Sequence, residues 1–535
     1  MINNKKSESV IKILDKKASK GNFYSAYQLY KYYSKGTYVK KSSKKADEYL
    51  MTAFNIFKEQ KLRITHLELE NFRGIHDLEI NINDKNLTVI LGINGVGKTT
   101  ILDAIALNIS WLRNSIINID GNGDFISSDD ISLENQSNYS SISTRFNLNK
   151  SLNANLEVVA VSEGFDINKK SYLKEIKKIG KMYKEANKID PYFNLPLLAY
   201  YTVDRSLDIN AKDVVSFDET TIFKKHEKFA GYQNSLNGVS DFKLFFRWYK
   251  RISDIANYRE SKKPKTPYAE LLHSLPEDID GSIKKVLLGL ISEEDKDKDK
   301  EKGESLDDAI NSKRILNKLV ASFMDGYGNI EIQLEPRLAL TIEKKGKKLN
   351  VLQLSQGEKS LLALVLDIGR RLIILNPGLE NPLDGDGIIL IDEIDLHLHP
   401  VWQRDIIRRL TNSFKNCQFI VATHSAQIIG EVKHSQVVVL HQETDHTVNC
   451  FQPPQTYGLT SNEVLSEVMS FDYPDLMLNR NSDVEDKLKE INELLSENLF
   501  EEAKSRISKL EIELNGEIPD LLSAKLDIEL SDWKD

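Results

Sequence analysis

Short runs of consecutive apolar residues recur along the chain and predict strands buried within a sheet. Four such runs span residues 87–91, 195–203, 387–391 and 418–423, and β-branched residues are frequent in them. Runs of four to eight apolar residues between turn signals are typical of buried strands. Because helical patterns occur between these runs, the sequence predicts an α/β fold.

Alternating apolar positions predict further strands. Between residues 63 and 82 the apolar side chains that set this pattern are Ile64, Leu67, Leu69 and Phe72, followed by Leu78, Ile80 and Ile82. This pattern indicates antiparallel strands that lead into the run at 87–91. Strands are also expected at residues 156–161, 330–334 and 339–342. Residues 121–150 are rich in Asn, Ser, Asp and Gly, which indicates loops and edge strands.

Helical spacing dominates both ends of the chain. Residues 1–60 carry apolar or small residues at helical intervals and predict paired helices that resemble one Sel1/tetratricopeptide-like repeat. A lone repeat cannot close its own core, so it packs either on the rest of the chain or on a partner. From about residue 463 an acidic helical tail follows, in which two helices share an apolar seam and form a hairpin or a docking surface.

Three internal helices are predicted at residues 170–183, 241–250 and 306–324. Residues 293–302 contain only charged residues and are expected to be a disordered linker.

Composition narrows the class of protein. The chain has 535 residues, 40% hydrophobic and 28% charged, as in ordinary globular proteins of two to four domains. No apolar run approaches the ~18 residues of a membrane helix, and the N-terminus lacks the apolar core of a secretory signal. Cys417 and Cys450 have no metal-ligand spacing, so both are expected to be reduced in a cytoplasmic protein.

Charge is distributed unevenly along the chain. Residues 1–61 contain 14 Lys and 5 Asp or Glu, a net charge of +9. Residues 481–535 contain 7 Lys or Arg and 16 Asp or Glu, a net charge of −9. A basic end can face nucleic acid or an acidic partner, but a solvated helical surface explains it equally well.

The clearest chemical signal is the stretch LGINGVGKTT at residues 91–100, which fits the pattern G-x-x-x-x-G-K-[ST]. It follows a predicted strand and opens a predicted helix, where backbone N–H groups and the positive helix end can hold phosphate oxygens. Lys98 is expected to reach the β- and γ-phosphates of ATP, and Thr99 to bind Mg²⁺. The nucleotide-binding residues expected here are Asn94, Gly95, Gly97, Lys98, Thr99 and Thr100.

A second motif, VLQLSQGEKS at residues 351–360, begins a long helical run. Ser355 and Gly357 lie at the helix start, where a hydroxyl and free N–H groups can meet an anion. Taken alone, the motif is also that of an ordinary Ser-capped helix. It resembles the signature of ABC-type ATPases (commonly LSGGQ), with Gln356 and Glu358 as departures. The resemblance implies that Ser355, Gly357 and Glu358 face ATP bound by the opposite subunit of a homodimer.

The run 387–391 ends in two carboxylates, Asp392 and Glu393. Asp392 is expected to hold Mg²⁺, and Glu393 to orient or deprotonate the attacking water. By the same resemblance, Asp395 communicates across the dimer, and His424 is the switch histidine that senses the γ-phosphate.

His397 and His399 could instead bind a metal, although no other ligand in the sequence points to them. The segment at 71–75 resembles the SMC/RecF/OLD branch of these ATPases and makes Arg73 a candidate nucleotide contact. The Gln-loop cannot be located, and Arg205 is a speculative member of it.

The whole chain resembles the PtuA-type ATPases of Septu and retron-associated anti-phage defence, an ABC/SMC-like, OLD-related family. The similarity rests on the compact middle region, the DEIDLHLHP stretch, the stretch at 457–469 and the acidic tail. No sustained heptads separate Thr100 from Leu354, and no HNH or Toprim signature is recognisable, so any nuclease must act in trans.

The resemblance implies an ABC/SMC-type P-loop ATPase head that forms a homodimer or higher oligomer and controls a partner HNH nuclease of the PtuB type. A reverse transcriptase and its RNA–DNA hybrid (msDNA) are further expected partners. A DNA-repair ATPase of the SMC/RecF kind and a scaffold with a nearly silent ATPase are the alternatives.

The expected domains are a Sel1-like module, a first ATPase lobe, an insertion, a second ATPase lobe and a C-terminal helical segment. Their predicted ranges are 1–62, 63–150, 151–345, 346–455 and 456–535.

Overall fold

The computed structural model describes most of the chain as two compact units. The described residues are 2–58, 61–82, 86–118, 121–132, 138–148, 152–203, 228–238, 242–260, 306–335, 338–443, 447–469 and 482–532. The first unit is Met1–Leu459 and the second is Thr460–Asp535. The predicted linker at 293–302 and Arg205 lie outside the described residues.

A six-stranded sheet forms the centre of the first unit. Its strand order is β13-β12-β3-β11-β10-β6, and the four pairs from β12 to β6 are parallel. The strands are β3 (Leu87–Leu91), β6 (Leu197–Tyr201), β10 (Gly387–Ile391), β11 (Cys417–Thr423), β12 (Val437–Gln442) and β13 (Val448–Phe451). All residues of β3, β6, β10 and β11 are buried. Parallel strands covered on both faces require such continuous apolar runs, so the prediction of buried strands is confirmed.

An antiparallel four-stranded sheet lies beside it, in the order β2-β1-β4-β5. These strands are β1 (Leu62–Phe72), β2 (Ile75–Asn81), β4 (Tyr139–Leu148) and β5 (Leu152–Val161). The prediction of edge strands in 121–150 is wrong for β4, which pairs with both β1 and β5. Its polar residues Ser140, Ser141 and Thr144 are buried, so composition misled the prediction.

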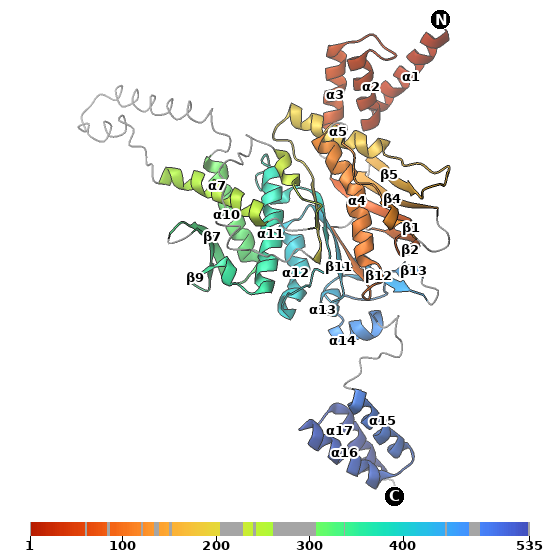
Figure 1. Cartoon of the computed structure of the whole chain (residues 1–535), viewed down its shortest axis with the longest axis vertical. Helices are drawn as coiled ribbons and strands as arrows, with labels where there is room; N and C mark the ends of the chain where they lie inside the picture. Colours follow the sequence, from red (N-terminus) through yellow and green to blue (C-terminus); the bar gives the residue numbers. More distant parts are fainter. Residues whose placement is uncertain are drawn as a thin grey trace, which may run out of the picture. The chain divides into compact units, whose positions relative to one another are not determined.

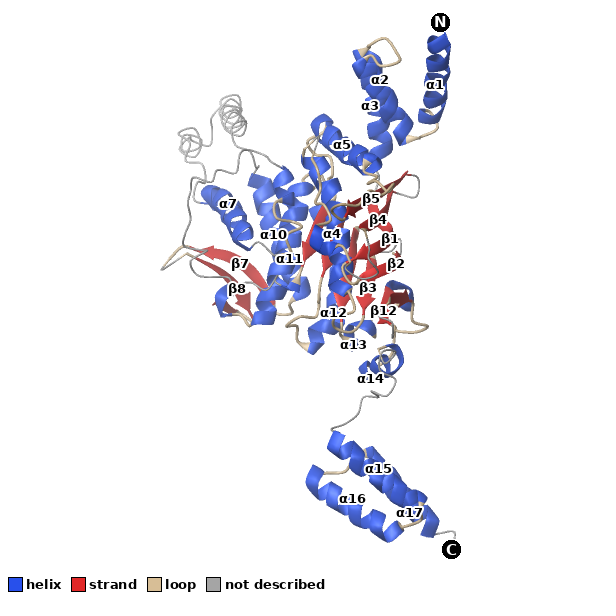
Figure 2. Ribbon diagram, turned by 45° about the vertical axis from the view of Figure 1, so that its right-hand side comes forward, coloured by secondary structure: helices blue, strands red, loops and turns tan. Residues whose placement is uncertain are grey.

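The helix α4 (Lys98–Ile117) contacts strands of both sheets. Figures 1 and 2 show it running alongside them, with α5 (Lys174–Ile189) packed against it. The stretch predicted as an insertion therefore supplies β5 and β6 to the two sheets, and α5 to the layer that covers α4.

Further α-helices among the described residues of this unit are α7 (Phe242–Glu260), α10 (Leu306–Phe323), α11 (Gln356–Leu375), α12 (Pro400–Ser413) and α13 (Ala426–Ile429). Of these, α11 contacts β6 of the central sheet, and α7 and α10 pack on α11. Beside α10 and α11 lies a three-stranded antiparallel sheet, formed by β7 (Tyr327–Gln333), β8 (Ala339–Lys344) and β9 (Lys347–Asn350).

The N-terminal module consists of three described helices, α1 (Ile2–Ala18), α2 (Phe23–Lys35) and α3 (Ser43–Phe57). It packs on the rest of its own unit through aromatic side chains. The Phe57 ring lies 4.6 Å from that of Tyr183 on α5, centroid to centroid, and the Tyr24 hydroxyl donates to Asn153 O at 2.9 Å. Of the two packing modes predicted for this module, contact with the same chain is present.

The second unit contains three long helices among its described residues, not the two that were predicted. After α14 (Ser461–Glu463) and a π-helical turn (Val464–Val468) come α15 (Ser482–Ser496), α16 (Phe500–Leu514) and α17 (Pro519–Asp532). The last three share a small apolar core, formed by Leu488, Ile491, Ala503, Ile507, Leu510, Leu521, Ala524 and Ile528.

In neither unit do the described residues include a helix with the length and apolar character needed to span a bilayer.

Candidate nucleotide-binding site

The glycine-rich turn joins the buried strand β3 to helix α4. Gly95 and Gly97 have φ values of 87° and 108°, which favour residues without a Cβ. Gly97 is the N-cap of α4 and supplies no side-chain hydrogen bond to the helix start. The first N–H groups of α4 therefore have no side-chain cap from this residue and are available to an anion. Asn94 and Gly95 are exposed at the turn.

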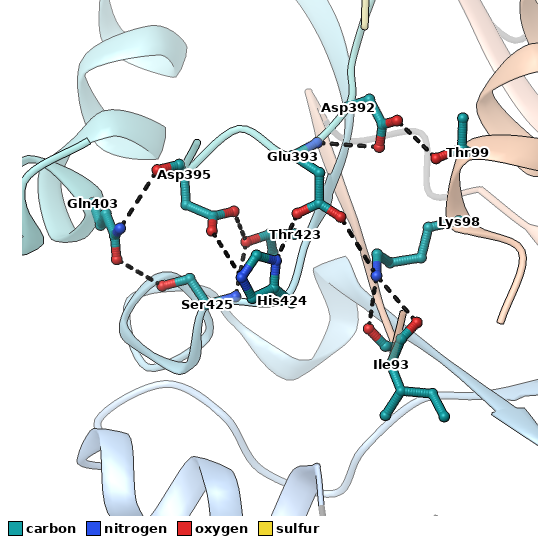
Figure 3. Close-up of polar contacts among 11 residues, drawn as sticks. Ile93, Lys98, Thr99, Asp392, Glu393, Asp395, Gln403, Thr423, His424 and Ser425 are labelled. Carbon is teal, nitrogen blue, oxygen red and sulfur yellow. Dashed lines mark hydrogen bonds and ion pairs between the residues drawn. The ribbon is translucent and has the colours of Figure 1, made fainter. Parts of the chain in front are cut away.

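Lys98 is the most buried cation of this site, with 4% of its surface exposed. Its ammonium group donates to Gly92 O at 2.9 Å and to Ile93 O at 3.2 Å. It also lies 3.5 Å from a carboxylate oxygen of Glu393 (Figure 3). A phosphate that binds here exchanges these carbonyl contacts for charge-assisted ones.

Thr99 and Asp392 are 293 positions apart in the sequence, yet the Thr99 hydroxyl donates to Asp392 Oδ2 at 2.7 Å. Asp392 is 1% exposed. Burial raises its pKa, the hydrogen bond from Thr99 opposes that shift, and the charge of Glu393 adds to it. A hydroxyl and a carboxylate side by side are the hard oxygen ligands that Mg²⁺ prefers. Thr100, the next residue of α4, is half-buried.

Glu393 connects the lysine to the histidine. Its backbone adopts φ 41°, and its N–H donates to Asp392 Oδ1 at 3.1 Å. One carboxylate oxygen faces Lys98, and the other lies 2.7 Å from His424 Nδ1. A left-handed conformation costs a non-glycine residue of order 1–3 kcal/mol, so surrounding contacts must hold it. Such strain is common where a side chain is aimed at a reaction.

His424 follows β11 and lies between two carboxylates, with Nε2 3.7 Å from Asp395 Oδ2 (Figure 3). Glu393, Asp395 and His424 bring their ligand atoms within 4.8 Å of one another, the geometry of a group that could hold a metal ion. His397 and His399, the pair considered from the sequence, do not belong to that group. The His399 ring instead accepts a hydrogen bond from Val401 N at 3.3 Å and caps α12.

Gln403, on the first turn of α12, joins the two loops behind these residues. Its side-chain NH₂ donates to Leu398 O at 3.1 Å and to Asp395 O at 3.4 Å. Its carbonyl oxygen accepts from the Ser425 hydroxyl at 3.0 Å. The sequence analysis did not identify Gln403 as a site residue. Its position three residues after Pro400, where α12 begins, is the feature of the sequence that could have pointed to it.

The signature segment forms a closed hydrogen-bonded cap at the start of α11. The Ser355 hydroxyl accepts from Glu358 N at 3.4 Å, and the Glu358 carboxylate accepts from Ser355 N at 2.7 Å. The same carboxylate accepts from Lys344 at 2.7 Å and from the Tyr327 hydroxyl. Burial opposes ionisation, but these donors prevail and lower the pKa of Glu358 to about 2.

Gly357 allows this cap to contact the segment that follows β10. A Cβ on Gly357 would lie 2.1 Å from His397 O, a distance that no side chain tolerates. His397 itself has φ 62°. At Gly357 the start of α11 and the segment between Asp395 and α12 therefore approach each other backbone to backbone.

Arg73 is held by carboxylates rather than by the glycine-rich turn. Its side chain donates to Asp130 at 2.8 Å and forms an ion pair with Asp103 of α4. The hydroxyl of Tyr200, in β6, donates to the other oxygen of Asp103 at 2.7 Å. Arg73 adopts φ 51° and keeps 38% of its side chain exposed. Among the described residues, no hydrogen bond or ion pair joins Arg73 to Lys98.

The chain is similar to known proteins over most of its length. Residues 87–430 match the family model described as "AAA domain, putative AbiEii toxin, Type IV TA system". The chain is 36% identical over 447 residues to the "Retron Ec83 probable ATPase" of Escherichia coli, covering 80% of each protein. It is 32% identical over 462 residues to the "Retron Vc95 probable ATPase" of Vibrio cholerae serotype O1 biovar El Tor, covering 86% of this chain and 89% of that one.

The chain belongs to this family of ABC/SMC-like AAA ATPases. The Septu protein PtuA of Bacillus thuringiensis is a partial relative, 34% identical over 127 residues, which are 22% of this chain and 32% of that protein. Among solved structures, the Smc head domain of Pyrococcus furiosus covers 73% of this chain and 96% of its own, at 17% identity and a TM-score of 0.40. The expected resemblance to retron and Septu ATPases, and the expected fold class, are confirmed.

Proposed function

We propose that this chain binds and hydrolyses ATP with Mg²⁺, as the regulatory subunit of an anti-phage defence complex. The observation that supports this most is the connected set Thr99–Asp392 and Lys98–Glu393–His424, which joins two motifs about 300 positions apart. Relatives named as retron ATPases and Septu PtuA support the defence role.

Each residue of the set has a distinct task in this proposal. The N–H groups of the glycine-rich turn bind the phosphates of ATP, and Lys98 neutralises the charge that develops on them. Glu393 accepts a proton from the attacking water, and Lys98 and His424 hold its carboxylate in position for this task. His424 keeps Glu393 oriented. Thr99 and Asp392 would hold Mg²⁺, which would supply further charge neutralisation at the phosphates.

Two copies act together in the proposed enzyme. Ser355, Gly357 and Glu358 lie on a helix start whose capping residues are exposed or half-exposed. A rigid, self-capped helix start can offer a hydroxyl and backbone N–H groups to an anion brought by another subunit. Each ATP then lies between Lys98 of one subunit and Ser355 of the other. Arg73 exchanges one of its carboxylate partners for the nucleotide when the site closes.

Mixing two inactive variants tests the composite site. Lys98→Ala and Ser355→Ala each spoil both sites of their own homodimer. A mixed dimer contains one site with both residues intact, so equal mixing restores about a quarter of wild-type turnover. If each site lies within one chain, mixing restores nothing, and the paired arrangement is wrong.

The proposed partner is an HNH nuclease, with a reverse transcriptase and its RNA–DNA hybrid as further members of the complex. The ATPase holds the nuclease inactive until infection changes its nucleotide state. Co-purification with the proteins encoded beside this chain, followed by nuclease assays with and without ATP, tests this role. A nuclease whose activity ignores both the presence of this chain and ATP would falsify it.

A further inference from the structure

Helix α17 of the second unit is apolar on two opposite faces. Leu521, Ala524 and Ile528 are buried against α15 and α16. Leu522, Leu526 and Leu530 are 46%, 57% and 62% exposed. With about 100° between successive residues, the three exposed leucines fall on one stripe, directly opposite the buried face.

This exposed stripe is not needed by the bundle itself. The helices α15, α16 and α17 form one bundle (Figure 2), and the residues of its apolar core do not include Leu522, Leu526 or Leu530. A surface helix normally carries polar residues on its outer face. Leucines at i, i+4 and i+8 are the spacing with which one helix anchors another in a groove.

The charges around the stripe indicate what covers it. Residues 482–532 contain 15 Asp or Glu and 6 Lys or Arg, a net charge of −9. Lys525, the only basic residue of α17, lies 2.5 Å from Glu511 and 2.8 Å from Glu517, so its charge is already compensated. Asp527 and Glu529 lie beside the stripe on the helical surface and add to the negative potential.

A second copy of this unit is therefore a poor occupant, because two surfaces of charge −9 repel each other. We propose that the stripe is a docking site for a partner protein that presents an amphipathic helix with Lys or Arg on both sides of its apolar face. The leucines supply the buried contact, and the surrounding carboxylates select a basic partner and fix its orientation. This inference does not depend on ATP hydrolysis.

Binding of two synthetic peptides to the full-length chain tests the proposal. Both peptides are amphipathic helices of about 18 residues with leucines on one face; one carries Lys on the flanks and the other carries Glu. The Lys peptide binds in the micromolar range, and Leu526→Ser weakens it about tenfold, since full burial of a leucine is worth roughly 1.5–3 kcal/mol. The triple variant with Leu522→Ser and Leu530→Ser added weakens it at least about a hundredfold.

Charge-matched controls separate a site from general attraction. Ile13→Ser removes an exposed apolar residue from α1, 55% exposed, and leaves binding unchanged. Asp527→Lys with Glu529→Lys weakens the Lys peptide and strengthens the Glu peptide. Equal binding of the Lys peptide to the triple leucine variant would show that only net charge attracts it, which overturns the docking site. Equal binding of the Lys and Glu peptides would overturn the proposal that the partner helix is basic. A dimer of the wild-type chain that the triple variant loses makes a second copy the occupant.

Discussion

The two halves of the proposed ATP site differ in how completely one chain builds them. The half at the end of β3, β10 and β11 is internally connected, from Thr99 and Asp392 through Glu393 to His424, and its Lys98 and Asp392 are buried. The half at the start of α11, called the capped half below, pairs its own polar groups, because Ser355 and Glu358 form two reciprocal hydrogen bonds with each other. None of the described contacts links Ser355 to Lys98.

This difference separates two tasks. In the proposed enzyme, the connected half holds Glu393 and His424 in contact before ATP arrives, and Lys98 exchanges its carbonyl contacts for the phosphates. The capped half is a rigid surface that needs no further contact within its chain, and it is suited to meet a second subunit. Variants in the first half should therefore change binding or chemistry in every chain, whereas variants in the second should act only between chains.

The largest effect is expected from Lys98→Ala. The substitution removes the buried ammonium that is proposed to bind the phosphates, so ATP affinity falls by at least about a hundredfold, as expected when a charged contact in a desolvated site is lost. Titration with a fluorescent ATP analogue measures it. Lys347→Ala, at an exposed position of β9, is the control. Retained affinity in Lys98→Ala would remove this lysine from the site.

Glu393→Gln is expected to separate binding from chemistry. Glutamine keeps the shape of the side chain but cannot accept the proton of the attacking water, so turnover falls about 10²–10³-fold. ATP affinity stays within a few-fold of wild type. Single-turnover hydrolysis and equilibrium binding, measured on the same preparation, check both statements. An unchanged rate would assign the proton acceptor elsewhere.

Gln403→Ala tests whether the connected half depends on residues behind it that position its loops. The substitution frees the loops that carry Asp395 and Ser425 from each other, so kcat falls about five- to tenfold while KM barely changes. Arg404→Ala, one residue further along α12 and exposed, is the matched control. A purely structural role for Gln403 would lower the melting temperature and leave kcat unaltered. That outcome would contradict a positioning role.

The smallest effect belongs to the capped half. The donors around Glu358 lower its pKa to about 2, so its contribution to stability is complete above the ordinary pKa of a carboxyl and is lost as the pH falls through about 2. Glu358→Gln should cost about 1–2 kcal/mol at neutral pH, the scale of a hydrogen bond to a charged group. Denaturant unfolding from pH 7 to pH 3 should show this difference shrinking with acidity. A stability difference between wild type and Glu358→Gln that grows on acidification would contradict a lowered pKa of Glu358.

The sequence predicted those parts of the site whose residues lie close together along the chain. The glycine-rich turn, the Asp392–Glu393 pair and the buried strands could be found because each motif is read within about ten residues. The partners of Arg73 were not predicted, since Asp103 and Asp130 meet it only through the fold. Gln403 was missed for the same reason.

Two errors in the fold have a physical cause in side-chain pattern. Strand β4 was assigned to an edge because buried Ser and Thr residues resemble a loop in composition. Helix α17 was not predicted because leucines on both faces erase the periodicity from which a helix is recognised. In β4 the unusual feature is burial of polar side chains, and in α17 it is exposure of apolar ones.

The missing side chain of Gly357 has a wider consequence. With a Cβ excluded at 2.1 Å from His397 O, the helix start proposed to meet a neighbour's triphosphate is in close backbone contact with the loop just beyond Glu393, the proposed general base. If two chains share ATP as proposed, this contact offers a short route by which occupancy of one pocket would be felt at the other. A pair of such chains should respond to ATP as a single sigmoidal switch, and a methyl group at position 357 should turn that response into two independent, hyperbolic ones.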